Sequence, residues 1–129
     1  MRFLLDTQVW IWLCKSPEKV SKRIRRQLEN EENELFLSAA SVWEIAIKYS
    51  LGKLPLPSPP AEYIAEALTI TDTRPLAIQF THAVRVSSLP FHHRDPFDRL
   101  LIAQSQVEGI PIVTADPAFR RYDVELISG

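Results

Sequence analysis

Short apolar runs alternate along this chain with longer stretches in which apolar residues recur every three or four positions. The short runs are apolar at nearly every position, which is typical of parallel strands that are covered on both faces. Parallel strands need long connections, usually helices, between them. The runs predict strands at 3–5, 34–37, 112–114 and 124–127, with a further strand at 74–77.

The stretches between these runs predict helices at 8–13, 18–30, 39–50, 61–68, 79–86 and 97–107. The second is strongly charged but places Val20, Ile24 and Leu28 at helical spacing, which indicates one buried stripe. The proline-rich segment 54–60 is expected to form a stiff surface connection. The alternation predicts an α/β fold, a three-layer sandwich with a central parallel sheet of about four to five strands. We expect residues 1–129 to form a single domain.

Composition and charge narrow the classes of partner. The net charge is −1, with 15 basic and 16 acidic side chains, so any contact with nucleic acid must come from a local basic patch. The single cysteine excludes an internal disulfide. No apolar run approaches the roughly 18 residues that a membrane span needs, and Asp6 comes too early for the core of a signal peptide. We therefore expect a cytoplasmic protein with no membrane partner.

Acidic residues stand where predicted strands pass into helices. In an open parallel sheet these points share one edge, and ligands bind there. Carboxylates that converge at one edge repel one another unless a cation lies between them. The sequence therefore predicts a divalent metal site built from four residues: Asp6, Glu44, Asp98 and Asp116.

Each of these acids also has a purely structural interpretation. Asp6 and Asp116 can cap the turns that follow them, since aspartate is a favoured N-cap. Glu44 can pair with Lys48 one helical turn later, which contributes only a few tenths of a kcal/mol. The metal-site interpretation rests on the four acids taken together.

The pair Asp95 and Asp98 must be separated. Asp95 precedes Pro96, which is the pattern of an N-cap followed by proline at the first helical position. Asp98 shares its helix face with Leu101 and Ile102, so its carboxylate is directed inward. We therefore assign Asp98 to the metal and Asp95 to capping or to a supporting position beside the ligands.

The acids lie in four short motifs: Leu4-Leu5-Asp6-Thr7, Ser38-Ala39-Ala40-Ser41-Val42-Trp43-Glu44-Ile45, Asp95-Pro96-Phe97-Asp98-Arg99-Leu100-Leu101-Ile102-Ala103 and Val113-Thr114-Ala115-Asp116. In this order they resemble the motifs of the PIN domain, and the closest likeness is to VapC-type toxins of toxin–antitoxin pairs. The resemblance implies a Mg²⁺- or Mn²⁺-dependent endoribonuclease that forms a homodimer, cleaves RNA and is silenced by a cognate antitoxin. By motif position, Asp6, Glu44, Asp98 and Asp116 match the acidic site of the family. Gln8 departs from it, since many relatives have Asn or His there.

Carboxylates suit hard cations such as Mg²⁺ or Mn²⁺, whether one ion or two. Such an ion binds the scissile phosphate and acidifies a water. We assign Asp6, Asp98 and Asp116 as metal ligands and Glu44 as the group that ligates or orients the attacking water. Residues expected to support the ligands are Thr7, Asp95 and Thr114.

Basic residues beside the acidic motifs are the candidates for RNA contact: Lys48, Lys53, Arg94 and Arg99. A denser basic run at 22–26 is interpreted as the solvated face of a helix. A histidine-based mechanism is disfavoured, and we expect His82, His92 and His93 to be surface or loop residues.

Two other functions remain open at this point. One is a PIN-type nuclease that acts in RNA maturation outside a toxin system, and the other is a non-catalytic PIN-like binding protein. The presence of all four acids argues against the second. Trp10, Trp12 and Trp43 belong either to the core or to an apolar groove for a partner peptide or second subunit.

Overall fold

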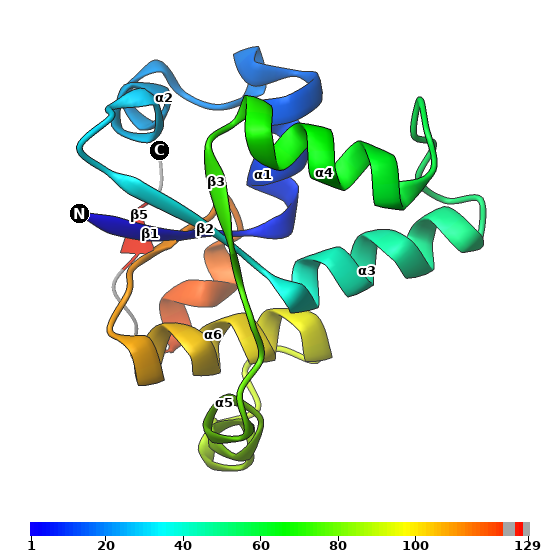
Figure 1. Ribbon diagram of the computed structural model, residues 1–129. Coiled ribbons are helices and arrows are strands. Elements are labelled where there is room, and N and C mark those ends of the chain that lie inside the picture. The colour runs from blue at the N-terminus through cyan, green and yellow to red at the C-terminus, as the bar shows by residue number, and fades with distance from the viewer. Residues whose placement is uncertain (123–125, 128–129) are drawn as a thin grey trace.

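A five-stranded parallel sheet lies at the centre of the computed structural model, which describes residues 1–122 and 126–127 (Figure 1). The strand order is β3-β2-β1-β4-β5, and every neighbouring pair is parallel. The predicted parallel sheet is thus confirmed, although residues 124 and 125 of the last predicted strand lie outside the described residues. The strands are β1 (Arg2–Leu5), β2 (Glu34–Ser38), β3 (Thr73–Leu76), β4 (Ile112–Val113) and β5 (Leu126–Ile127).

Helices connect the strands and cover both faces of the sheet. They are α1 (Thr7–Lys15), α2 (Lys22–Glu29), α3 (Ala39–Ser50), α4 (Pro60–Ile70), α5 (Phe80–Arg85) and α6 (Pro96–Glu108). Short 3-10 turns are η1 (Pro17–Lys19), η2 (Val86–Ser88) and η3 (Pro117–Arg121). In the part of the chain that the structure describes, none of the helices has both the length and the apolar character to cross a bilayer.

The predicted helix at 18–30 was wrong in its first part. The segment forms η1 and then α2, because Val20 is extended and Ser21 begins a new helix. The side chain of Ser21 accepts a hydrogen bond from the backbone N–H of Ile24, as an N-cap does. The buried stripe is as predicted, since Val20, Ile24 and Leu28 are all in the core.

The central strand β1 shows how the three layers are held together. Phe3 and Leu5 pack on one face of the sheet against α1, α2 and α4, while Leu4 packs on the other face against α6. This alternation follows from the two-residue period of a strand. Figure 1 shows α1 and α4 on one side of the sheet and α5 and α6 on the opposite side. The α/β sandwich is therefore confirmed.

The order of the strands locates the site. The chain passes from β1 outward through β2 to β3 and then returns to β4 on the other side of β1. This reversal places the carboxyl ends of β1 and β4 side by side, where open α/β sheets bind ligands. The backbone N–H of Asp6 donates to the carbonyl of Val113 at 2.9 Å, so the segments that leave the two strands begin in contact.

Candidate metal centre at the carboxyl edge of the sheet

The structure brings the four predicted acids into one cleft. Asp6 follows β1, Glu44 lies on α3, Asp98 is in the first turn of α6, and Asp116 precedes η3. The cleft has a volume of about 520 Å³. It is also lined by Thr7, Gln8, Ile11, Trp12, Ile45, Lys48, Lys53, Leu54, Asp95 and Ala115.

Asp6 serves both as a helix cap and as part of the acidic cluster. One carboxylate oxygen accepts from the backbone N–H of Gln8 at 3.3 Å, and the other accepts from the hydroxyl of Thr114 at 2.7 Å. Burial raises the pKa of Asp6, and the charges of Glu44 and Asp116 raise it further against these hydrogen bonds. The two interpretations of Asp6 were therefore not exclusive.

The two threonines tie the acidic elements together. Thr114 donates to Asp6 and accepts from the backbone N–H of Asp116 at 3.0 Å, so one hydroxyl links two of the acids. Thr7 donates to the fully buried Ser41 at 2.7 Å, which joins the start of α1 to α3. Ser41 was not among the predicted site residues. Its position one turn before Glu44 on the same helix face was the available signal.

Glu44 is buried, with 7% of its surface exposed. Its Oε2 accepts from the ammonium of Lys48 at 2.7 Å, so the predicted i to i+4 pair is present, and this hydrogen bond raises the pKa of Lys48. Its Oε1 is buried and has no hydrogen-bond partner among the described residues. A carboxylate oxygen left in this state costs free energy unless another group binds it.

Asp98 reports the crowding of negative charge most directly. Burial, followed by repulsion from Asp95, Asp6, Glu44 and Asp116, raises its pKa to about 8. Asp95 caps α6 as predicted, because its carboxylate accepts from the backbone N–H groups of Phe97 at 2.8 Å and of Asp98 at 3.3 Å. The capping contact fixes the first turn of the helix, and with it the position of Asp98.

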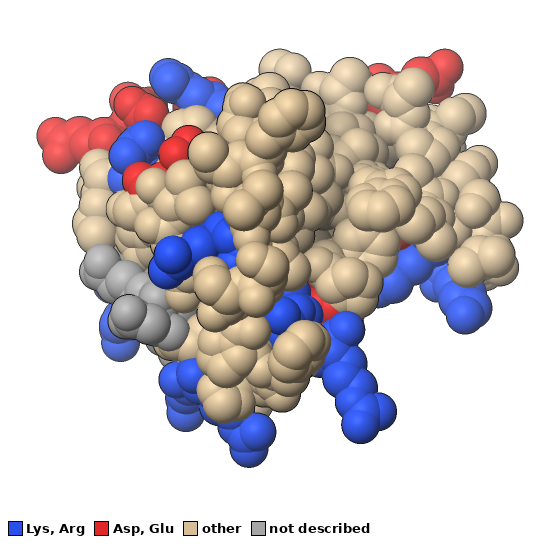
Figure 2. Space-filling view, turned by 90° about the horizontal axis from the view of Figure 1, so that it is seen from below, with Lys and Arg blue, Asp and Glu red and all other residues tan. Residues whose placement is uncertain are grey.

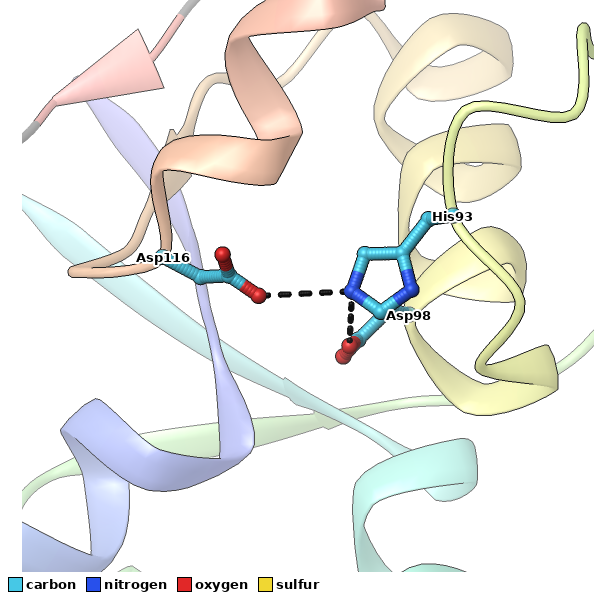
Figure 3. A group of neighbouring side chains, drawn as sticks. All are labelled: His93, Asp98 and Asp116. Carbon is cyan, nitrogen blue, oxygen red and sulfur yellow. Dashed lines mark hydrogen bonds and ion pairs between the residues drawn. The ribbon is translucent and has the colours of Figure 1, made fainter.

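His93 points into the acidic cluster, which the sequence did not predict (Figure 3). Its Nε2 lies 3.0 Å from Oδ2 of Asp98 and 3.3 Å from Oδ2 of Asp116. The ligand atoms of the three residues lie within 4.8 Å of one another. His93 lies in a loop, as predicted. His93 lies two residues before Asp95, the N-cap of α6, and this position was the available signal. The spacing of residues in the sequence does not show which way its side chain points.

The other two histidines differ from each other. His92 is exposed, as predicted. His82 is only 1% exposed on α5, where its Nδ1 accepts from the backbone N–H of Gln79 at 2.9 Å, so the prediction of a surface residue was wrong there. The ring caps the start of its own helix and packs against α6 through Gln104.

The predicted RNA-contacting cations fall into two groups. Lys48 and Lys53 line the cleft, and Arg94 is exposed just before α6. The prediction that Arg99 contacts RNA was wrong, because only 6% of its surface is exposed. Its guanidinium donates to the carbonyl oxygens of Val86, Leu89 and Pro90 and to the hydroxyl of Tyr122. It is therefore engaged in holding the loop before α6.

The three tryptophans also differ in how deeply they are buried. Trp10 is fully buried and donates to the hydroxyl of Thr71 at 3.2 Å. Trp12 is half-buried at the side of the cleft. Trp43 is 58% exposed and meets Phe97 edge-on, with ring centroids 5.0 Å apart. Only Trp10 is a full member of the core.

The chain belongs to the PIN domain family, whose model matches residues 3–125. A segment of 68 residues is 43% identical to Ribonuclease VapC16 of Mycobacterium tuberculosis. That match covers 51% of this chain and 48% of the relative, so it spans about half the length of the protein it resembles.

Solved structures share the fold over nearly the whole chain. One is VapBC2 from Rickettsia felis bound to a DNA fragment from its promoter, with a TM-score of 0.75, 14% identity and coverage of 99% of this chain and 98% of that one. Another is VapBC-5 from Mycobacterium tuberculosis, a member of the VapBC family of toxin–antitoxin systems, with a TM-score of 0.61, 18% identity and the same coverage. At these identities the likeness shows the fold alone.

The raised pKa of Asp98 predicts how stability depends on pH without divalent ions. The folded protein holds this proton up to about pH 8, whereas the unfolded chain releases it near the ordinary value of 3.8. The folded state therefore loses stability as pH rises from about 4 through about 8. Urea unfolding in EDTA at pH 5 and pH 8 should show this loss in the wild type and a smaller one in Asp98→Asn. Equal losses in both proteins would contradict the assignment.

The contacts of Arg99 predict a structural role. Arg99→Met removes the charged donor to the carbonyl oxygens of Leu89 and Pro90 and to the hydroxyl of Tyr122. It should lower the free energy of unfolding by roughly 2–4 kcal/mol. The control Arg94→Met changes an exposed side chain and should stay within about 0.5 kcal/mol of the wild type. Urea denaturation measures both. If both variants changed the free energy of unfolding by a similarly small amount, the structural role of Arg99 would be contradicted.

Proposed function

We propose that this protein is a divalent-metal-dependent endoribonuclease, the toxin of a toxin–antitoxin pair, that hydrolyses phosphodiester bonds in RNA. The observation that carries the proposal is the convergence of Asp6, Glu44, Asp98 and Asp116 in one cleft from four different elements. Membership of the PIN domain family and the partial likeness to a ribonuclease support it. We take residues 1–129 as a single nuclease domain.

The donors in the cleft fit Mg²⁺ or Mn²⁺. All four acids offer carboxylate oxygens, which hard cations prefer, and no cysteine lines the cleft among the described residues. The buried, unpartnered Oε1 of Glu44 and the raised pKa of Asp98 both indicate negative charge that the protein itself does not balance. Asp6, Asp98 and Asp116 would hold the ion, with Glu44 beside them.

The residues of the cleft would have different roles in hydrolysis. A bound divalent ion supplies positive charge for the scissile phosphate and acidifies a water. Glu44 would orient the attacking water and accept its proton through the oxygen that Lys48 does not occupy. Thr114 keeps Asp6 in place, Thr7 holds α1 against α3, and Asp95 fixes the helix start that presents Asp98.

The distribution of cations suits an RNA backbone. Lys48 and Lys53 line the same cleft as the acids, and Arg94 lies exposed before α6. In the view of Figure 2, Lys and Arg gather along the lower part of the face, whereas most Asp and Glu lie along its upper edge. A protein with a net charge of −1 can therefore still present a local basic rim to phosphates.

We extend the proposal to partners and location. One VapBC structure that shares the fold is described as a member of a family of toxin–antitoxin systems, and another similar structure is a toxin–antitoxin complex, which supports a cognate antitoxin here. The side chains of Trp43, Ile70, Phe80 and Phe91 are exposed apolar surface that an antitoxin or the second subunit of a homodimer would cover. A cytoplasmic location, where RNA is translated, belongs to the same proposal.

Removing single ligands tests the enzymatic proposal. Asp6→Asn and Asp98→Asn should each lower Mg²⁺-dependent cleavage of RNA by about 100-fold or more, because charge stabilisation of the transition state is lost. Asp72→Asn is a matched control, since Asp72 is exposed and has a positive φ that asparagine also adopts. Gel assays of a structured RNA measure the rates. Unchanged cleavage by both site variants would refute the proposal, and RNA binding without cleavage by the wild type would favour a binding protein.

Metal binding should also be visible as thermal stabilisation. An ion that binds only the folded protein at a hundredfold excess over its Kd adds about 2.7 kcal/mol, which raises the Tm by several degrees. Mg²⁺ or Mn²⁺ should therefore raise the Tm of the wild type relative to EDTA, and Asp6→Asn should abolish the rise. Identical melting curves with metal and with EDTA would count against a metal site.

A further inference from the structure

The loop that precedes α6 is held by the buried side chains of Arg99 and Tyr122, although His92 within the loop is exposed. The hydroxyl of Tyr122 accepts from the backbone N–H groups of His92 at 3.1 Å and His93 at 2.8 Å. It also accepts from Arg99 at 3.3 Å, and Arg99 in turn donates to the carbonyl of Pro90 at 2.8 Å. The backbone of His93 is therefore fixed from the interior.

The ring of His93 is fixed as well. The backbone N–H of Asp95 donates to its Nδ1 at 3.1 Å, so Nδ1 presents a lone pair and the neutral ring carries its proton on Nε2. The Nε2–H group faces Oδ2 of Asp98 and Oδ2 of Asp116, as the dashed lines in Figure 3 mark. The ring also meets Phe119 edge-on, with centroids 6.1 Å apart. One donor is thus presented to two carboxylates from different elements.

We propose that His93 is a positioning residue of the metal centre, whose Nε2–H group joins the carboxylates of Asp98 and Asp116 and holds them at ligand spacing before the ion binds. This inference rests on the proposed function. When both groups are ionised, as metal ligands must be, carboxylates this close repel each other, and a shared donor offsets that repulsion. The contact uses one of about four lone-pair positions on each carboxylate, so the others remain free for an ion.

The same geometry argues that His93 is not itself a ligand. Ligation through Nε2 requires that the proton move to Nδ1. Nδ1–H would then face the backbone N–H of Asp95, which is also a donor, at 3.1 Å. His93 would have to leave its present position to bind an ion. Its role is therefore to orient Asp98 and Asp116, in the way that outer hydrogen bonds orient metal ligands.

Binding of Mn²⁺ by the full chain, measured by calorimetry, tests the proposal without reference to activity. In His93→Asn the shorter side chain reaches only the position of Nδ1, so Mn²⁺ affinity should fall by about tenfold or more. In His93→Gln the amide N–H reaches the position of Nε2, and most of the affinity should return. Tyr122→Phe, which loosens the loop, should give an intermediate loss. Mn²⁺ binding by His93→Asn that equals or exceeds that of the wild type would overturn the inference.

Nitrogen NMR of the metal-free wild type provides a second readout. The Nε2–H tautomer of His93 is expected, and the Nδ1–H tautomer would overturn the proposal whatever the binding data show. Failure of the proposed function and failure of this inference alone give different results. A wild type that neither binds Mn²⁺ nor cleaves RNA defeats the proposed function and this inference together. A wild type that does both while His93→Asn binds Mn²⁺ equally well defeats the inference alone.

Discussion

Repulsion among carboxylates at one edge of the sheet is the constraint on which the site depends. Two unit charges 4 Å apart interact by about 4 kcal/mol at an effective dielectric constant of about 20. The protein offsets this by several small means: protonation favoured at Asp98, the ion pair of Glu44 with Lys48, and donors from Thr114 and His93. None of them carries two positive charges into the centre of the cluster. A divalent ion does, which is why the arrangement favours one.

The fold could be predicted because its signals are periodic. The near-continuous apolar runs identified the strands that helices cover on both faces, and helix α3 was predicted with the bounds that the structure shows. The convergence of the acids followed from topology, since a parallel sheet carries its strand ends to one edge. Proline after Asp95 located the start of α6. Metal ligation by these acids and the extent of the domain stay predictions.

The supporting residues could not be predicted in the same way, because their partners are backbone groups in irregular segments. Arg99 follows Asp98 in the sequence and resembles a free cation, yet it binds three carbonyl oxygens of the preceding loop. His93 depends on where that loop returns, which no period in the sequence describes. The structural contacts that the sequence suggested for Asp6 and Glu44 are both present. Capping and ion pairing were treated as rivals of the metal-site role, and the structure contains these contacts within the acidic cluster itself.

The direct backbone contact between Asp6 and Val113 has a consequence for how such proteins tolerate change in length. Strands in a ladder stand about 4.8 Å apart whatever joins them. The distance between the segment of Asp6 and the segment of Asp116 is therefore set by the main-chain pairing of β1 with β4. It does not depend on the length of the chain that connects them. Insertions or deletions in surface connections, such as the exposed turn at 30–32, can accumulate without moving the chemistry.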